Sequence, residues 1–242
     1  MSYFSFLKSS VVKKKVIPQV LILWRTLMRL VFSLREGTYL FFSLYLKYPK
    51  LFIYDVRKSL YSLWKNPYAQ LRRLPQSSLL KDGNVYGETP WSALYTISKA
   101  FEITSTEVVY DLGCGLGKAC FWFSHVVGCQ VVGIDNQEEF IRFSSKVHGK
   151  LSSIPALFCL KDFQEVSLSQ ASCVYFYGSS YSLRILRNLM QVFSELPSGS
   201  YVISISFPLD SLARGKELFS IEKSCSVRFP WGKTIAYKNI RK

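Results

Sequence analysis

The amino-acid sequence predicts an α/β protein with a Rossmann-like, doubly wound and mainly parallel sheet of seven strands. From residue 83 onward, short apolar runs rich in β-branched residues alternate with longer segments of helical character. A glycine-rich turn at residues 111–117 joins one of these strands to the helix that follows it. Residues 219–237 hold two strand-like runs around Pro-Trp-Gly, which predicts an antiparallel C-terminal hairpin at the sheet edge.

The individual elements follow in order along the chain. Thr89-Pro90 is typical of a helix start, with threonine as N-cap and proline at the first helical position, and this helix runs to about Phe101. Strands are expected at residues 107–112, 130–135, 157–160, 172–177 and 201–207. Helices are expected between them at residues 116–127, 137–148 and 183–195. The terminal hairpin places residues 219–227 beside residues 234–237.

The first third of the chain differs from the rest in charge. The formal net charge is +15, and residues 1–81 hold 15 lysine and arginine residues against only Glu36 and Asp55. The remaining residues are nearly balanced, with 16 basic and 14 acidic side chains. We therefore expect a basic, apolar helical N-terminal region at residues 1–82 and a separate α/β domain at residues 83–242.

The apolar segments of the N-terminal region, residues 16–34 and 38–54, are interrupted by basic residues and by Pro49. Neither offers the ~20 uninterrupted apolar residues that a membrane-spanning helix needs. They predict one or two amphipathic helices, whose interfacial aromatic residues are Trp24, Tyr39, Tyr45 and Trp64.

Three interpretations of this region stay open. It forms a helical cap that packs on the domain, it contacts an anionic membrane surface through residues 1–65, or it binds RNA or an acidic protein. The six cysteines form no C-x-x-C pair, which favours reduced thiols and a cytoplasmic location, peripheral at a membrane in the second case. The two histidines, His125 and His148, belong to no ligand cluster, so no metal is expected.

The sharpest feature is the loop that follows the strand at residues 107–112. It reads Asp-Leu-Gly-Cys-Gly-Leu-Gly, and its glycines are Gly113, Gly115 and Gly117. Glycines let the backbone turn tightly at the strand end and approach a ligand closely. Asp135 ends the next strand, 24 residues after Asp111, where it can accept hydrogen bonds from ribose hydroxyls.

The acidic residue before the first glycine distinguishes between nucleotide cofactors. Asp111 would lie near the pyrophosphate of a dinucleotide, and the two anions would repel each other. S-adenosylmethionine (SAM) has no phosphate and carries a cationic amino group and a sulfonium, which suit a carboxylate. Asp162-Phe163 follows the strand at residues 157–160, where the carboxylate can receive the adenine amino group and the ring can pack on the base; a strand-ending aspartate alone is more often only a cap. The sequence therefore predicts SAM as cofactor and S-adenosylhomocysteine as product.

Together, Tyr86-Gly-Glu-Thr89, the Asp111–Gly117 loop and Asp162-Phe163 resemble the seven-strand, non-SET histone lysine methyltransferases of the disruptor-of-telomeric-silencing family. The layout is also similar to that of the membrane-associated mitochondrial lysine methyltransferases, which have an apolar N-terminal segment before a small methyltransferase domain. The resemblance covers roughly residues 84–210, whereas residues 1–80 match only in character.

This resemblance implies roles for the segment before the domain. Glu88 and Thr89 would hold the methionine end of SAM, and Tyr86 would help to close the site. By composition alone, the same segment is a turn and a helix start.

The resemblance ends after the fourth strand. The histone enzymes have Asn-Asn-Phe there, whereas this chain has Tyr175-Phe-Tyr-Gly-Ser-Ser180 and no Asn/Asp-Pro-Pro-Tyr segment of the kind found in other amino-group methyltransferases. We take Tyr175, Tyr177 and Gly178 as candidate acceptor-pocket residues, because tyrosine rings can surround a cationic group. The alternative is that these tyrosines are strand aromatics in the core.

The sequence thus predicts a SAM-dependent methyltransferase whose leading acceptor is a protein lysine. Two alternatives stay open: an RNA methyltransferase that uses the basic N-terminal region, and a non-catalytic SAM-binding interaction module. In-line methyl displacement needs alignment and exclusion of water more than it needs a strong base.

Overall fold

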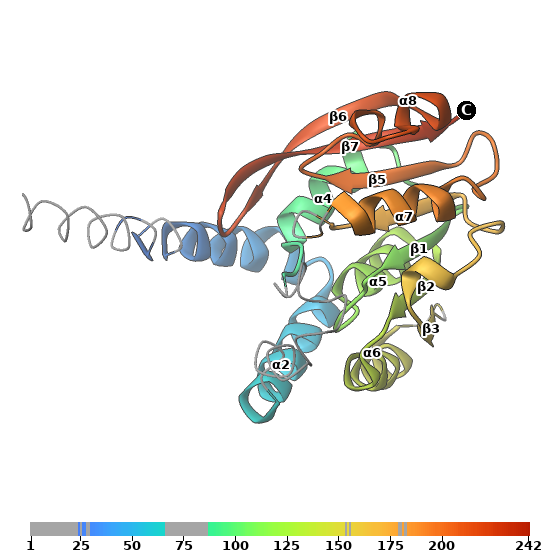
Figure 1. Ribbon diagram of the computed structural model, residues 1–242. Helices are drawn as coiled ribbons and strands as arrows, with labels where there is room; N and C mark the ends of the chain where they lie inside the picture. The colour runs from blue at the N-terminus through green and yellow to red at the C-terminus, as the bar shows by residue number, and fades with distance from the viewer. Residues whose placement is uncertain are drawn as a thin grey trace, which may run out of the picture.

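A mixed sheet of seven strands forms the centre of the protein (Figure 1). The computed structural model describes residues 24, 26, 27, 30–65, 87–152, 154, 156–178, 181 and 183–242. The strands are β1 (Val108–Leu112), β2 (Gln130–Asp135), β3 (Ala156–Leu160), β4 (Cys173–Phe176), β5 (Tyr201–Ile205), β6 (Phe219–Phe229) and β7 (Gly232–Arg241). Their order is β3-β2-β1-β4-β5-β7-β6, in which β1 to β5 run parallel and β7 pairs antiparallel with β5 and β6. The predicted fold class, including the hairpin at the edge, is confirmed.

Helices connect the strands where the sequence predicts them. They are α4 (Trp91–Ala100), α5 (Lys118–Trp122), α6 (Glu138–Leu151) and α7 (Leu183–Phe193), with α8 (Gly215–Leu218) before the hairpin. The π-helical segment η3 (Phe123–Val127), which continues α5, and the short 3₁₀ helices η4 (Phe163–Glu165) and η5 (Leu209–Ser211) complete the domain. One detail is wrong: Pro90 rather than Thr89 is the N-cap of α4, and no side chain caps this helix.

Separate apolar cores cover the two faces of the sheet. Cys173 and Tyr175 of β4 belong to the core formed with α4, α5 and α6, whereas Val174 and Phe176 belong to the core under α7. Successive side chains of a strand point to opposite faces, so β4 is buried on both sides, as a central strand of a doubly wound sheet must be.

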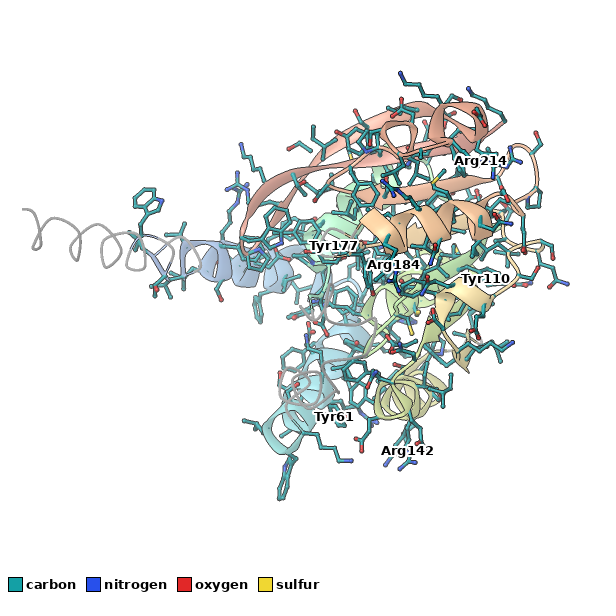
Figure 2. The ribbon with its side chains drawn as sticks, viewed as in Figure 1. Tyr61, Tyr110, Arg142, Tyr177, Arg184 and Arg214 are labelled. Atoms are coloured by element: carbon teal, nitrogen blue, oxygen red, sulfur yellow. The ribbon has the colours of Figure 1, made fainter. Side chains whose placement is uncertain are left out.

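The N-terminal region contributes a cap to the first core. Residues 30–39 are helical and are followed by η1 (Leu40–Tyr45) and α2 (Pro49–Trp64). Tyr54 of α2 is fully buried, with its ring stacked on Phe121 at 5.2 Å and edge-on to Trp91 at 5.5 Å. Tyr61 lies 4.6 Å from the ring of Phe143, on the side of α2 that faces α6 (Figure 2).

The opposite side of this cap is apolar and exposed. Side chains between 41% and 88% exposed are Phe41, Phe42, Leu46, Phe52, Ile53, Val56, Leu60, Leu63 and Trp64. The helical residues 30–39 project away from the sheet (Figure 1) and expose Leu30, Val31 and Leu34 in the same way. Amphipathic helices normally turn their apolar stripe to the core, whereas α2 buries only Leu51 and Tyr54 and leaves most of its apolar side chains exposed. No helix within the described residues is long and apolar enough to cross a membrane.

Candidate functional site

The predicted site residues converge at one edge of the sheet. Strand β1 pairs with both β2 and β4, so the strand order reverses there, and ligands of doubly wound sheets bind at such a switch point. Asp111 and Asp135 lie at or next to the carboxyl ends of β1 and β2, Asp162 follows β3, and Tyr177 follows β4. Because parallel strands end at the same edge, the topology places all four together.

The glycine loop is fixed against the end of β2. The backbone N–H groups of Gly113 and Cys114 donate to the carbonyl of Ile134 at 2.8 and 2.9 Å. The N–H of Gly115 donates to Oδ2 of Asp135 at 2.9 Å. Asp135 therefore organises the loop and also presents its carboxylate at the strand end.

Glycine is required at position 117 for two reasons. Its φ of +82° lies in the left-handed region, which disfavours other residues, and a Cβ there would lie 2.9 Å from the side chain of Ser144 and 3.2 Å from Phe158. Gly113 and Gly115 also have positive φ values, +80° and +54°. The three glycines of the loop thus place backbone without side chains at the switch point.

Two carboxylates of this edge are buried. Asp111 is 4% exposed, and the thiol of Cys120 donates to its Oδ2 at 3.2 Å. Burial raises the pKa of Asp111 to about 7, and the negative charge of the neighbouring Asp135 adds to the increase. The hydrogen bond from the Cys120 thiol lowers this pKa in part. Burial also raises the pKa of Asp135 to about 6, against the lowering effect of the N–H groups of Gln137 and Gly115.

These raised pKa values predict that the SAM-free protein loses stability as the pH rises. Between the ordinary value of 3.8 and about 7, folded Asp111 holds a proton that the unfolded chain has lost. The free energy of unfolding therefore falls with pH across this window and levels off above it. We expect thermal melts between about pH 5 and about pH 8 to show this decline, and Asp111→Asn to remove a large part of it. The control Glu195→Gln changes an exposed carboxylate of the α7–β5 connection; an Asp111→Asn variant that kept the full wild-type decline would contradict the assignment.

The segment before α4 lies against the end of β4. The hydroxyl groups of Thr89 and Tyr175 are hydrogen-bonded to each other, and both side chains are buried. A Cβ on Gly87 would lie 3.3 Å from the ring of Tyr177. Tyr86 lies outside the described residues, so its predicted role in closing the site stays a prediction.

Glu88 links the glycine loop to α2. It forms an ion pair with Lys58 of α2 and lies 3.9 Å from Nζ of Lys118, which follows Gly117 and begins α5. The Lys118 ammonium also lies 4.6 Å from the ring centre of Trp91, and burial lowers its pKa. Lys118 was not among the residues predicted from the sequence, although its place directly after the loop was a usable signal.

A second contact from α2 reaches the loop itself. The Tyr54 hydroxyl donates to the carbonyl of Leu116 at 3.0 Å. Leu51 and Tyr54 are buried, Lys58 and Tyr61 are partly buried, and their helical spacing places them on the inward face of α2. This inward face was not predicted from the sequence, because the apolar residues of the region carry the stronger periodic signal.

The two candidate acceptor tyrosines differ in burial. Tyr175 is 2% exposed and belongs to the core, as the alternative interpretation expects. Tyr177 is half-buried, accepts the indole N–H of Trp231 at 2.9 Å and lies 5.0 Å from the ring of Phe229. Trp231 is 53% exposed at the turn of the hairpin. Figure 2 shows Tyr177 on the side of the sheet from which the N-terminal helical residues project.

Packing explains the glycine at position 178, because a Cβ there would overlap the ring of Phe176. Tyr181, which the sequence analysis did not select, stacks on Phe176 at 5.8 Å and meets the ring of Phe163 edge-on at 5.3 Å. The Tyr181 hydroxyl lies 3.5 Å from the place of a Cβ on Gly113, directly beside the loop.

Asp162 makes a local contact. Its Oδ1 accepts the backbone N–H of Gln164 at 2.9 Å and caps η4. A carboxylate oxygen retains further acceptor capacity in such a cap, so contact with an adenine amino group stays a prediction.

The residues at this edge fit SAM better than a dinucleotide. Bare glycine backbone lies between the buried carboxylates of Asp111 and Asp135, which suit a cationic amino acid and a ribose diol and would repel a pyrophosphate. Among the residues that the structure describes, no three His, Cys, Asp or Glu side chains gather as a metal site.

Solved structures share this fold. The chain is similar to an RNA methyltransferase from Salinibacter ruber in complex with S-adenosyl-L-homocysteine, at 21% identity and a TM-score of 0.53 over 64% of this chain and 95% of that chain. It is also similar to magnesium protoporphyrin IX methyltransferase from Synechocystis with bound S-adenosylhomocysteine, at 16% identity and a TM-score of 0.52 over 80% and 100% of the two chains. The architecture is therefore that of the class I, seven-strand methyltransferases.

Residues 75–205, more than half of the chain, match the family described as "Histone methylation protein DOT1". The chain belongs to this family, and the SAM cofactor predicted from the sequence agrees with this membership.

Curated relatives show a more distant similarity. Carboxy-S-adenosyl-L-methionine synthase of Psychromonas ingrahamii is 27% identical over 130 residues, which are 50% of this chain and 52% of that protein. The enzyme of the same name from Shewanella pealeana is 30% identical over 111 residues, 42% and 45% of the two chains. The chain thus spans about half the length of the curated relatives it matches.

Proposed function

We propose that this protein transfers a methyl group from SAM to a lysine side chain of a protein substrate. The observation that carries the proposal is the aromatic rim at the end of β4, where Tyr177 and Trp231 are hydrogen-bonded beside the segment that holds Glu88 and Thr89. Membership of a histone methylation family supports a protein acceptor. Tyr175 and Gly178 would then support the rim and not contact the acceptor. Tyr175 does so through its hydrogen bond with Thr89, and Gly178 through its close packing on Phe176.

The chain's own residues would position the cofactor. When bound, SAM supplies a sulfonium methyl group, whose carbon a nucleophile can attack in line as the bond to sulfur breaks and S-adenosylhomocysteine leaves. Asp135 would accept hydrogen bonds from the ribose, and Asp162 and Phe163 would flank the adenine. Glu88, Thr89 and the ionised Asp111 would face the methionine end; SAM binding would therefore favour loss of the Asp111 proton.

The aromatic rim would prepare the acceptor. Only roughly 1 in 2,500 lysines with an unperturbed pKa near 10.4 is neutral at pH 7, and only the neutral amine is nucleophilic. Poorly solvated aromatic surroundings lower the pKa of a lysine and raise this fraction. The rings of Tyr177 and Trp231 would exclude water around the amine without a dedicated base.

We expect Tyr177→Ala to lower methyl transfer at least about tenfold, because it removes one side of the rim. SAM affinity should change by less than about twofold, since Tyr177 lies on the acceptor side. The measurement is transfer of tritiated methyl from SAM into fractionated cell lysate, with SAM affinity measured by calorimetry. Tyr177→Phe keeps the ring and should retain most of the activity; equal loss in both variants would contradict a role for the ring.

The same labelling reaction tests the acceptor class. We expect protease, and not ribonuclease, to release the label, and mass spectrometry to place it on lysine. Label on another amino acid would refute the lysine proposal, and tight SAM binding without any labelled acceptor would favour a non-catalytic module.

RNA methylation is the second candidate, favoured by the basic first third of the chain. Neutralising several phosphates makes binding steeply dependent on salt. Label that ribonuclease releases, together with RNA affinity that falls steeply between low and physiological salt, would support this candidate over the first.

We also propose that the cap brings the enzyme to an anionic membrane surface. Support comes from the exposed apolar side chains of α2 and residues 30–39, which accompany basic residues such as Lys47, Lys50 and Arg57. Exposed apolar surface of this extent, next to cations, is typical of helices that lie in a membrane interface. In this proposal, residues 1–82 make the membrane contact and residues 83–242 form the methyltransferase domain.

A further inference from the structure

A cavity of about 350 Å³ lies outside the methyl-transfer site, between three elements. Residues 30–39 form one wall, α4 forms the second, and the β6–β7 hairpin forms the third. Figure 1 shows the turn of this hairpin beside the helical residues that project from the domain. None of the site residues discussed above lines this cavity.

The cavity is rich in positive charge. Arg35, Arg228 and Lys233 line it, and Arg228 and Lys233 are direct cross-strand partners in the hairpin. Like charges placed opposite each other destabilise a strand pair, so a pair of this kind needs an anion or another reason to be present. Within the described part of the chain, none of these three cations forms an ion pair.

The one carboxylate of the cavity is already engaged. Oε1 of Glu36 accepts the backbone N–H of Ser92 at 3.2 Å, and Oε2 accepts the hydroxyl of the same residue. Glu36 thus fixes residues 30–39 to the start of α4. The three cations therefore favour a ligand with negative charge.

Three aromatic side chains also line the cavity, among small and apolar residues. Phe32, Tyr39 and Tyr95 line the cavity, and the rings of Tyr39 and Tyr95 meet edge-on at 6.4 Å. Positions three or four apart share a face of a helix, so Arg35 lies next to residue 31 on one side and next to Tyr39 on the other. Arg35 therefore lies between the cavity lining and the exposed side chains of residues 30, 31 and 34. A ligand with a phosphate and an apolar chain would satisfy both surfaces.

We propose that this cavity binds the phosphate headgroup of an anionic phospholipid. A guanidinium recognises phosphate oxygens in a bidentate manner, and Arg35 and Arg228 supply two of them beside the Lys233 ammonium. Free phosphate shares this chemistry, but the exposed Leu30, Val31 and Leu34 favour a lipid, whose acyl chains they can contact. The inference rests on the proposed membrane contact and gives it a specific site.

The site would also orient the enzyme. Trp231 lies at the turn between Arg228 and Lys233, and its indole N–H donates to Tyr177. A headgroup held by this hairpin would therefore place the aromatic rim close to the membrane surface, where an acceptor lysine of a membrane protein would be found.

The test uses the full chain and vesicles of phosphatidylcholine with or without phosphatidylglycerol. The variant Arg35→Gln/Arg228→Gln/Lys233→Gln is compared with Lys150→Gln/Arg187→Gln/Lys216→Gln, which removes three exposed cations from α6, α7 and α8. We expect the cavity variant to bind phosphatidylglycerol vesicles at least about tenfold more weakly than the control variant. Thermal melts check that both variants are folded.

The possible outcomes are distinct. Equal loss in the two variants would show a diffuse charge effect and overturn the headgroup site while leaving the membrane contact in place. Wild-type protein that binds neither vesicle would refute both proposals. Inorganic phosphate that binds in calorimetry and depends on the three cations, with vesicle binding unchanged in the cavity variant, would assign the cavity to a free phosphate. Vesicle binding does not depend on methyl transfer. Failure of the lysine proposal in the labelling experiment would therefore leave the result of this test unaffected.

Discussion

Replacing Asp135 with alanine is expected to weaken SAM binding by about a hundredfold or more. The carboxylate would lose its hydrogen bonds to the ribose, and hydrogen bonds to charged groups contribute about 1.5–3 kcal/mol each. Asp135 also holds the loop through the N–H of Gly115 at 2.9 Å, so its removal frees the backbone that approaches the cofactor. The measurement is calorimetric titration with SAM, and with S-adenosylhomocysteine to separate affinity from turnover.

The matched control is Asp210→Ala, an aspartate of η5 that is remote in sequence and topology from the loop. We expect it to retain wild-type affinity. Asp135→Asn should lie between the two, since an amide keeps one acceptor oxygen and loses the charge. Wild-type affinity in Asp135→Ala would exclude this carboxylate from the cofactor site.

Tyr54→Ala is expected to lower the free energy of unfolding by about 3–5 kcal/mol, the usual cost of truncating a large buried aromatic side chain. Tyr54 is 1% exposed, packs on Phe121 and Trp91, and donates to the carbonyl of Leu116. Its loss would therefore open a cavity and release the glycine loop together. Chemical denaturation measures the change, and SAM affinity should fall with it.

Phe52→Ala is the control on the same helix. Phe52 is 54% exposed, so we expect a loss below about 1 kcal/mol. Tyr54→Phe isolates the hydrogen bond and should cost about 1 kcal/mol. Equal destabilisation by the Tyr54→Ala and Phe52→Ala variants would contradict the packing of α2 on the domain.

The order of elements was predictable because local patterns determine it. The strand at residues 130–135 was predicted with its observed bounds, and the helix predicted at 137–148 is observed at Glu138–Leu151, three residues longer at its C-terminal end. Parallel pairing follows from the alternation of strands and helices, so the convergence of Asp111 and Asp135 followed as well.

Contacts that depend on tertiary packing were not predictable. Thr89 has the sequence context of an N-cap, but its hydroxyl is hydrogen-bonded to Tyr175, which lies far away in the chain. Gly178 was selected for the acceptor pocket, and its packing against Phe176 accounts for the absence of a side chain there. Neither contact leaves a periodic signal in the sequence.

The largest difference concerns α2. Hydrophobic periodicity favours burial of the apolar stripe, whereas Phe52 and Leu63 are exposed. The inward contacts come from Tyr54, which donates to the glycine loop, and from Lys58, which pairs with Glu88 before α4. An apolar stripe that faces outward is consistent with burial in a surface the protein binds, which sequence periodicity alone does not distinguish from a core.

The most direct test of the account is a crystal structure of the chain with S-adenosylhomocysteine. We predict that the ribose hydroxyls lie within hydrogen-bond distance of the Asp135 carboxylate and that the methionine end lies between Gly113 and Glu88. The ligand bound elsewhere, or its ribose turned away from Asp135, would contradict it.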